Sequence, residues 1–355
     1  MPNAPHFQTP TTLNRLDRLR NRRVEVIEKQ VTVNEVYARM ASETSSAVKY
    51  AIGSMQPIDP EYTRNTYKEA ERVKDQLEKN LATRQLVCDY EYQGSVSNDT
   101  HIFAKSDIDL LTLYCGFVTL DPPQKATSPY QGDPVKDLLV LRQLSTQILE
   151  ARFPQATVDS SRAKSVSIEG GSLRRKVDVV ASNWCDTCEY ARTRQKRDRA
   201  INILDAHKLT RPRNMPFLHN ALLDEKDRRT LNGLRKAIRL LKSLKYDADT
   251  EVKLSSYDIC AIVYNMSDSD LIVPKGAELV LVRNCNAYLD GLNANRIYRE
   301  SLDVPDGTRK IFGGEGATVD GLNQVRKEVS QLQHDIENEL SRSFRKLAEA
   351  RIAYA

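Results

Sequence analysis

The sequence has no apolar run approaching the roughly 20 residues that a membrane-spanning helix requires. Its first 23 residues are polar and then basic, without the apolar core of a secretory signal. Six cysteines lie mostly in apolar or strand-like contexts, so we expect reduced thiols rather than a disulfide framework. Together these absences predict a cytoplasmic protein with no membrane partner.

Several common catalytic patterns are also missing. The five histidines have no metal-ligand spacing, and the Gly-rich segment 313–316 lacks the Lys-Ser/Thr ending of a P-loop. Cys185 and Cys188 form a single CxxC, and His207 and His219 are too widely spaced to complete a usual zinc finger. We therefore favour two ordinary thiols over a zinc site, although the CxxC leaves zinc open.

Positive charge is unevenly spread, although the net charge is only +5. A run of basic residues lies between positions 192 and 213. Such a run favours contact with polyphosphate or nucleic acid, but it is equally typical of a solvated, mobile connector. Aromatic residues are not interleaved with it, which weakens the case for base stacking. The run consists of Arg192, Arg194, Lys196, Arg197, Arg199, Lys208, Arg211 and Arg213, against only Asp198 and Asp205.

The order of patterns along the chain predicts an α+β protein with a mixed α/β lobe followed by a helical lobe. We expect a flexible tail over 1–12, N-terminal helices and a catalytic lobe over 13–190, a basic connector or lid over 191–225, and a helical lobe over 226–355. Periodicity predicts helices near 13–49, 60–82, 135–152, 231–244, 257–266, 278–292 and 322–350, and strands near 86–92, 107–114, 156–160, 164–169 and 173–181.

Three carboxylates stand out in the predicted strands. Strand side chains alternate between faces, so Asp107 and Asp109 project together while their apolar neighbours point into the core. Asp178 lies between two valines and is presented in the same way. Carboxylate oxygens suit Mg²⁺, which usually keeps substrate phosphates among its ligands. We therefore predict that these three residues hold two Mg²⁺ ions, with Mn²⁺ as a substitute.

A Gly-Ser turn precedes the acids by about a dozen residues. Gly94 lets a phosphate come close to the main chain, and Ser95 adds a hydroxyl ahead of amides that can cradle an anion. Two metals about 4 Å apart stabilise both the attacking and the leaving oxygen of an in-line displacement. The pattern predicts attack of a ribose hydroxyl on an α-phosphate, with pyrophosphate leaving. An inactivated relative is the alternative, but no acid is missing.

These motifs resemble those of the polymerase-β-like nucleotidyltransferase superfamily: Gly94-Ser95, residues 107–109 and residues 177–180. The second half narrows the resemblance, because residues 234–242 and 254–257 look like the helical lobe of cyclic GMP-AMP synthase and its bacterial relatives, the cGAS/DncV-like nucleotidyltransferases (CD-NTases). The resemblance spans roughly residues 60–300. It implies a nucleotidyltransferase lobe, with a mixed sheet and flanking helices, packed on a C-terminal helical lobe.

The resemblance also implies nucleotide-binding roles in the helical lobe. Lys242 would contact the donor triphosphate, Ser256 would hydrogen-bond a phosphate and Tyr257 would stack on a base. Arg235, Arg239 and Lys242 form a basic stripe that could face the phosphates, and its alternative is a solvated helix face. The alternative for the motif Ser255-Ser256-Tyr257 is a helix N-cap with a core tyrosine.

The sequence departs from this family in two places. Many relatives carry a Gly-Thr pair after the Gly-Ser turn, and here the matching pair is Asp99-Thr100, which puts the shape of that loop in question. Cyclic GMP-AMP synthase of animals also has a zinc-binding insertion that grips DNA. Because no such insertion is evident here, activation by DNA is not supported.

We therefore expect an enzyme that joins nucleoside triphosphates, such as ATP and GTP, into a cyclic di- or trinucleotide. The resemblance implies that the product activates an antiphage effector, that partner proteins regulate the enzyme, and that conjugating partners act on its C-terminal tail. Two alternatives stay open: a template-independent nucleotidyltransferase acting on RNA, tRNA, protein or an antibiotic, and a nucleotide-binding regulatory module without turnover. The sequence does not fix the bases, the linkage or the activating signal.

Overall fold

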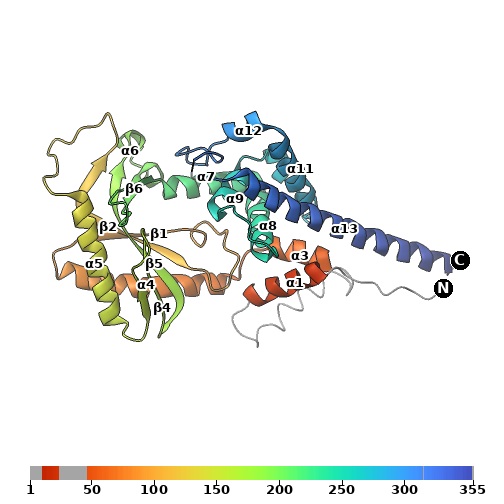
Figure 1. Cartoon of the computed structure of the whole chain (residues 1–355), viewed down its shortest axis with the longest axis horizontal. Helices are drawn as coiled ribbons and strands as arrows, with labels where there is room; N and C mark the ends of the chain where they lie inside the picture. Colours follow the sequence, from red (N-terminus) through yellow and green to blue (C-terminus); the bar gives the residue numbers. More distant parts are fainter. Residues whose placement is uncertain (1–9, 24–45, 315, 354–355) are drawn as a thin grey trace. The chain divides into compact units, whose positions relative to one another are not determined.

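The computed structural model describes residues 10–23, 46–314 and 316–353. It forms two compact units (Figure 1). The sheet unit comprises Ile58–His101 and Lys105–Asp224, and the helical unit comprises Met1–Pro57, Ile102–Ala104 and Glu225–Ala355. Of the predicted segment 13–190, the described residues up to Pro57 and residues 102–104 therefore belong to the helical unit. Residues 58–101 and 105–190 belong to the sheet unit.

The sheet unit contains one mixed sheet of seven strands among the described residues. The strand order is β1-β2-β5-β4-β3, and β6 pairs with both β5 and β7. β2 and β5 are parallel and the other pairs are antiparallel. Its elements are α4 (Pro60–Ala82), β1 (Cys88–Gln93), β2 (Ile108–Leu120), α5 (Pro134–Arg152), β3 (Thr157–Asp159), β4 (Val166–Gly170), β5 (Leu173–Asp186), α6 (Cys188–Thr193), the short 3₁₀ helix η2 (Lys196–Asp198), β6 (Ala200–Ile203) and β7 (Arg213–Asn214).

The helices α4 and α5 cover one face of this sheet (Figure 1). Both start in the same way: an Asp side chain caps the first turn and a Pro occupies the first position of the helix. Parallel strands need a crossover connection, and the connection from β2 to β5 contains α5. Buried side chains of β2 and β5, such as Leu110 and Val177, pack against these helices. The residues that alternate with these along β2 and β5 therefore point to the opposite face of the sheet.

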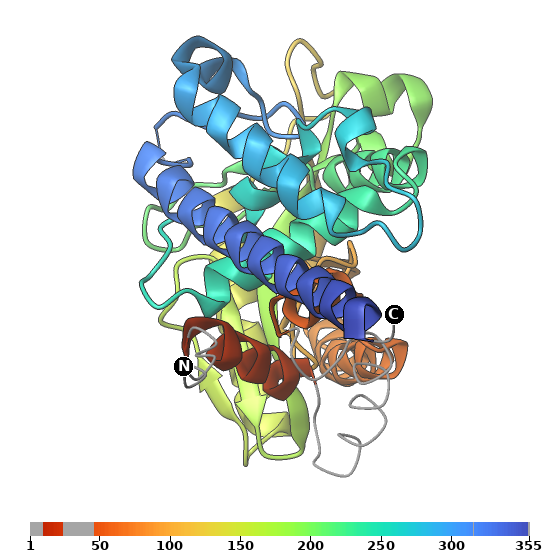
Figure 2. The same ribbon diagram turned by 90° about the vertical axis from the view of Figure 1, so that its right-hand side faces the viewer.

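The helical unit is built around α8 (Gly233–Asp247) and the long helix α13 (Val319–Ala353). Figure 2 shows α13 running across the unit, and it contacts α3, α8 and α11. The remaining helices are α1 (Pro10–Arg23), α3 (Ser46–Met55), α9 (Ser256–Tyr264), α10 (Asp268–Leu271), α11 (Val280–Ala294) and α12 (Arg296–Ser301), and α7 (Pro216–Arg229) contributes its last residues.

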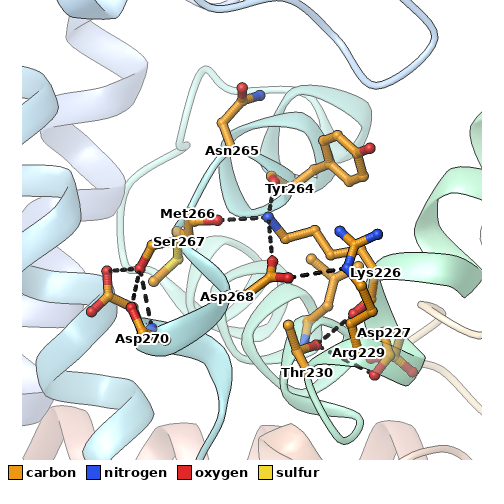
Figure 3. A network of polar contacts seen from close by, with 12 residues as sticks. Lys226, Asp227, Arg229, Thr230, Tyr264, Asn265, Met266, Ser267, Asp268 and Asp270 are labelled. Atoms are coloured by element: carbon orange, nitrogen blue, oxygen red, sulfur yellow. Dashed lines mark hydrogen bonds and ion pairs between the residues drawn. The ribbon is translucent and has the colours of Figure 1, made fainter.

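A polar network fixes the last turn of α7 against α9 and α10 (Figure 3). The buried ammonium of Lys226 donates hydrogen bonds of 2.6 Å to the carbonyl oxygens of Tyr264 and Met266, at the end of α9. Lys226 and Arg229 both pair with Asp268 at the start of α10. A cation at a helix C-terminus satisfies carbonyls that have no partner within the helix. The network therefore anchors the segment that leads into α8.

The predicted fold class, a mixed sheet with flanking helices and a helical lobe, is confirmed. The predicted helices near 60–82, 135–152 and 322–350 match α4, α5 and α13. The predicted helix near 13–49 is instead α1 and α3, and residues 24–45 lie outside the described part. The tail predicted over 1–12 falls on undescribed residues up to 9, while 10–12 start α1.

Two predicted strands are shorter than those in the structure. β2 extends to Leu120, and β5 extends to Asp186 because its last residues pair with β6. β6 lies inside the basic segment 191–225, so the interpretation of that segment as a mobile connector is wrong for 200–203. No helix of the described residues is long and apolar enough to cross a membrane.

Candidate active site

The parallel pairing of β2 and β5 brings two of the predicted acids side by side. Asp109 and Asp178 are register partners, one on each strand. Asp107 comes just before β2 and is exposed, whereas Asp178 is buried. Ile108 and Leu110 are both buried in the core against α4 and α5, so Asp109 projects from the opposite face, as alternation predicts. All three acids belong to the sheet unit.

Gly94 follows β1 and lies directly over this site. Its φ of +91° is a conformation that L-residues rarely adopt, and a Cβ at this position would stand 2.7 Å from Asp109 Oδ2. Glycine is therefore required here for two reasons, the backbone angle and the close approach to the carboxylate. The structure brings the predicted Gly-Ser turn and the acid pair together.

The turn after Gly94 closes as a Schellman motif. The amide of Thr100 donates to the carbonyl of Ser95 at 2.9 Å, the amide of Asp99 donates to the carbonyl of Val96 at 3.4 Å, and Asp99 has a φ of +54°. Such a motif needs a left-handed residue at the position that Asp99 occupies, and Asp tolerates that conformation better than most L-residues. Asp99 therefore has a backbone role that accounts for its departure from the family's Gly-Thr pair.

The acids repel one another in a poorly solvated place. The pKa of the Asp109 carboxyl is raised to about 7, chiefly by burial and then by the negative charges of Asp178 and Asp107. Burial also raises the pKa of Asp178, although the cations Lys176 and Arg162 oppose this effect. Desolvation and like charges both disfavour the ionised form. The site therefore favours binding of additional positive charge.

Two protein cations already contact the acids. Lys176 lies two residues before Asp178 on β5, and its ammonium is 2.8 Å from Asp107 Oδ2 and 3.4 Å from Asp178 Oδ2. A guanidinium nitrogen of Arg162 lies 3.6 Å from Asp178 Oδ2. The buried Arg142 of α5 holds the loop that carries Arg162 by donating to the carbonyls of Ser160 and Arg162.

The donor set suits a hard divalent cation. Three carboxylates supply oxygen ligands, and Asp178 Oδ1 is buried and accepts no hydrogen bond from the described residues. In the arrangement seen, no three His, Cys, Asp or Glu side chains within residues 10–23, 46–314 and 316–353 are grouped so that they could hold a metal ion. Because Lys176 contacts both Asp107 and Asp178, metal binding would require its ammonium to move.

The two predicted phosphate contacts on α8 are buried in the helical unit. Arg239 donates a 2.9 Å hydrogen bond from its Nε to the carbonyl oxygen of Met55 on α3. Lys242 is also buried, and burial lowers its pKa. Arg235, at the start of the same stripe, pairs with Asp227 at 3.0 Å. The stripe is therefore not a solvated helix face, and its contact with phosphate stays a prediction.

The Ser-Ser-Tyr motif opens α9. Ser255 is the N-cap, and its hydroxyl accepts from the amide of Asp258 at 3.0 Å, while Ser256 is exposed in the first turn. The hydroxyl of Tyr257 donates to Asp306 at 3.0 Å, and the guanidinium of Arg309 lies 5.2 Å from the centre of its ring. The capping interpretation is confirmed for Ser255. The roles predicted for Ser256 and Tyr257 toward a nucleotide are untested.

The basic run is largely paired with acids of the same unit. Arg192 pairs with Glu189, Lys196 with Glu91, Arg199 with Asp186 and Arg213 with Asp121. Arg199 also stacks 4.2 Å from the ring centre of Trp184, a tryptophan that is buried and donates to Asp89. Trp184 is therefore a core residue. This pairing weakens the interpretation of the run as a nucleic-acid contact.

The CxxC cysteines have separate partners. The buried Cys185 lies 3.5 Å from Asp121 Oδ1, and the exposed Cys188 lies 3.6 Å from the carbonyl oxygen of Pro122. Burial, together with Asp121, raises the pKa of Cys185 to about 12. Both are free thiols in the structure.

Sequence reasoning missed Lys176 and Arg162. A signal for Lys176 was present, because strand alternation places residues 176 and 178 on one face. No sequence signal identifies Arg162, because its position depends on a loop that Arg142 anchors from another element.

The chain matches no protein-family model. It is 37% identical over 328 residues to a protein of Yersinia aleksiciae named cyclic dinucleotide synthase CdnE, and the match covers 89% of this chain and 86% of that protein. It is 29% identical over 341 residues to a c-di-GMP synthase of Lachnospiraceae bacterium strain RUG226, covering 87% and 94% of the two chains.

Solved structures give a concordant result. A STING-associated CdnE c-di-GMP synthase from Capnocytophaga granulosa matches with a TM-score of 0.76 and 27% identity, covering 92% of this chain and 99% of that one. The similarity to these relatives therefore extends over both compact units, in sequence and in fold.

Proposed function

Because the chain belongs to the cGAS/DncV-like nucleotidyltransferases (CD-NTases), as its 37% identity to a cyclic dinucleotide synthase over 89% of its length shows, we propose that it joins two nucleoside triphosphates into a cyclic dinucleotide. The chain is thus a nucleotidyltransferase, and the cyclic product is the proposal. The single observation that carries the choice of site is the register pairing of Asp109 with Asp178, with Asp107 alongside.

The chemistry is two successive nucleotidyl transfers. In each, a ribose hydroxyl oxygen of one nucleotide attacks the α-phosphorus of another. The bond between that phosphorus and the oxygen that links it to the β-phosphorus breaks, and pyrophosphate leaves with the electron pair. The second transfer closes the ring. Asp178 is the group that we assign to orient the attacking hydroxyl and to accept its proton, since Oδ1 accepts no hydrogen bond from the described residues.

Asp107, Asp109 and Asp178 would hold the divalent ions, Mg²⁺ or Mn²⁺. Bound there, such ions supply positive charge to the attacking and leaving oxygens. The raised pKa of Asp109, caused by burial and by the other two acids, supports this assignment, because an added cation would relieve that repulsion. Gly94 would let the triphosphate approach the main chain, and Ser95 would offer a hydroxyl and a turn amide.

The helical unit would contribute the remaining nucleotide contacts. We retain Lys242, Arg239 and Ser256 as predicted phosphate contacts and Tyr257 as the predicted base-stacking residue. Arg239 already donates to a backbone carbonyl and Tyr257 to Asp306, so both would have to keep or exchange these partners when a nucleotide binds. Antiphage signalling and regulation by partner proteins stay predictions as well.

A direct experiment uses the full chain with labelled ATP, GTP, CTP and UTP, Mg²⁺ and no primer, followed by phosphatase. We expect a small labelled product that resists phosphatase and has the mass of a cyclic dinucleotide. The double change Asp107→Asn and Asp109→Asn should lower its yield by more than about a hundredfold, since even losing an outer partner of a metal ligand costs about 10- to 100-fold.

The matched control removes two charges from the same unit without touching the site. Asp75→Asn with Glu78→Gln changes exposed residues of α4 and should leave the yield unchanged. Release of pyrophosphate with only phosphatase-sensitive product, or product that requires added RNA, would contradict the cyclic product. Full activity in the Asp107→Asn, Asp109→Asn enzyme would contradict the site.

A further inference from the structure

We infer that Lys176 is a positioning residue whose ammonium holds Asp107 and Asp178 together and must be displaced when a divalent ion binds there. The inference rests on the proposed function, because it needs a metal at Asp107, Asp109 and Asp178. It adds a residue outside the acid motif that competes with the ion for the same carboxylates.

The geometry places the ammonium where two acids converge. Lys176 Nζ lies 2.8 Å from Asp107 Oδ2 and 3.4 Å from Asp178 Oδ2, so a single cation bridges the residue before β2 and the acid of β5. The side chain of Lys176 is 15% exposed and that of Asp178 is 11% exposed. The contact with Asp178 is therefore screened less by water and salt than a surface pair, whereas the side chain of Asp107 is 51% exposed and its contact is more strongly screened.

Asp109 and Asp178 are the two less exposed acids, and the sheet holds their backbones opposite one another, so that two carboxylates face each other away from water. An isolated ionised carboxylate is costly to bury unless it is paired. Among the described residues, Lys176 and Arg162 are the side chains that pair with these acids.

Lys176 and Arg162 differ in how many acids they contact, and this difference decides which of the two side chains must move. Arg162 approaches Asp178 at 3.6 Å with a side chain that is 52% exposed, so it contacts one acid from the solvent side. Lys176 contacts two of the three acids that would hold the metal. Its ammonium is carried on a flexible four-carbon stem and can leave without any movement of β5.

The test measures the binding of Mn²⁺ alone, by the loss of its free electron paramagnetic resonance signal. Binding to the Asp107→Asn, Asp109→Asn variant defines the background. We expect Lys176→Met to bind Mn²⁺ about tenfold more tightly than the wild type, because removing a like charge at this distance favours the ion. The same variant should melt at a lower temperature without metal and gain more from added Mn²⁺.

Two controls separate the effect of the bridging charge from a general effect. Lys176→Arg keeps the charge and should stay near the wild-type affinity. Arg174→Met removes an exposed cation two residues earlier on the same face of β5 and should leave the affinity unchanged. If Lys176→Met does not fold, Lys176→Gln provides the same neutral change with a polar end.

The possible results separate the two claims. Equal Mn²⁺ affinity in the wild type and Lys176→Met, both above background, would overturn the role of Lys176 and leave the proposed function standing. Binding at background level in both proteins would overturn the metal site itself and this inference with it.

Discussion

At the residue scale, the turn after β1 is decided by two backbone positions, Gly94 and Asp99. Gly94 makes room for Asp109, and Asp99 adopts the left-handed conformation that closes the Schellman motif. The first position excludes every other residue, because a Cβ there would collide with a carboxylate oxygen. The second only disfavours other residues, so it can vary between proteins that share the same turn.

The effect of a substitution at Asp99 on stability should depend on how well the new residue tolerates the left-handed conformation, and not on its charge. We expect Asp99→Gly to raise the free energy of unfolding by about 0.5 kcal/mol and Asp99→Val to lower it by about 1–2 kcal/mol, because a branched side chain crowds a left-handed residue. The melting temperatures of the two variants, compared with that of the wild type, report both changes in stability. Asp99→Asn is the control, since it keeps the backbone tolerance and removes the charge. A larger change for Asn than for Val would show that the carboxylate, not the backbone, matters here.

The sequence predicts the acid residues well because strand alternation is a local rule. It places Asp107 and Asp109 on one face without knowledge of the partner strand. The same rule places Lys176 with Asp178, but a lysine near acids has no special meaning until the pairing of β2 with β5 is known. Arg162 could not be predicted, because its loop is positioned by a tertiary contact with Arg142 of the preceding helix α5.

At the element scale, the site depends on one parallel pair of strands and the connection between them. α5 was predictable from its helical periodicity, and so was the strand that carries Asp178. β6 was not, because the charges that surround it mask four buried residues. Three of those charges are paired with acids on β1, on β5 and just after β2, and such long-range pairing leaves no trace in a local pattern.

A long-range helix cap gives a test at this scale. Glu339 of α13 accepts hydrogen bonds from the amides of Ala47 and Val48 and from the hydroxyl of Ser46, at the start of α3. A carboxylate at a helix N-terminus satisfies free amides and favours the helix dipole. We expect Glu339→Ala to lower the free energy of unfolding of the helical unit by about 1–2 kcal/mol.

The control for this cap is Glu337, which lies two residues earlier on the same helix and is exposed. Its carboxylate accepts a hydrogen bond from Gln333 one turn before it, so it makes a local contact within α13. Glu337→Ala should change the free energy of unfolding by less than about 0.5 kcal/mol. The melting temperature of each variant, measured at one protein concentration, distinguishes them. Equal effects of the two substitutions would mean that α13 does not hold α3 through the Glu339 carboxylate.

At the scale of the whole molecule, the residues predicted to bind metal or nucleotide are distributed over both compact units. The sheet unit holds Gly94, Ser95 and the three acids, and the helical unit holds the residues predicted to bind the nucleotide. The helical unit also combines α3, near the start of the chain, with helices that follow residue 225. Periodicity along the sequence reveals each helix but not this grouping, because contacts between distant segments decide it.

The central claim is that Asp107, Asp109 and Asp178 hold the metal at which nucleotides are joined. The most direct measurement is a crystal structure of the full chain with Mn²⁺ and a non-hydrolysable triphosphate, in which anomalous scattering locates the manganese. We predict anomalous peaks within coordination distance of all three carboxylates, with the ammonium of Lys176 moved away from Asp107 and Asp178. Manganese bound elsewhere, with Lys176 still paired to both acids, would contradict the account.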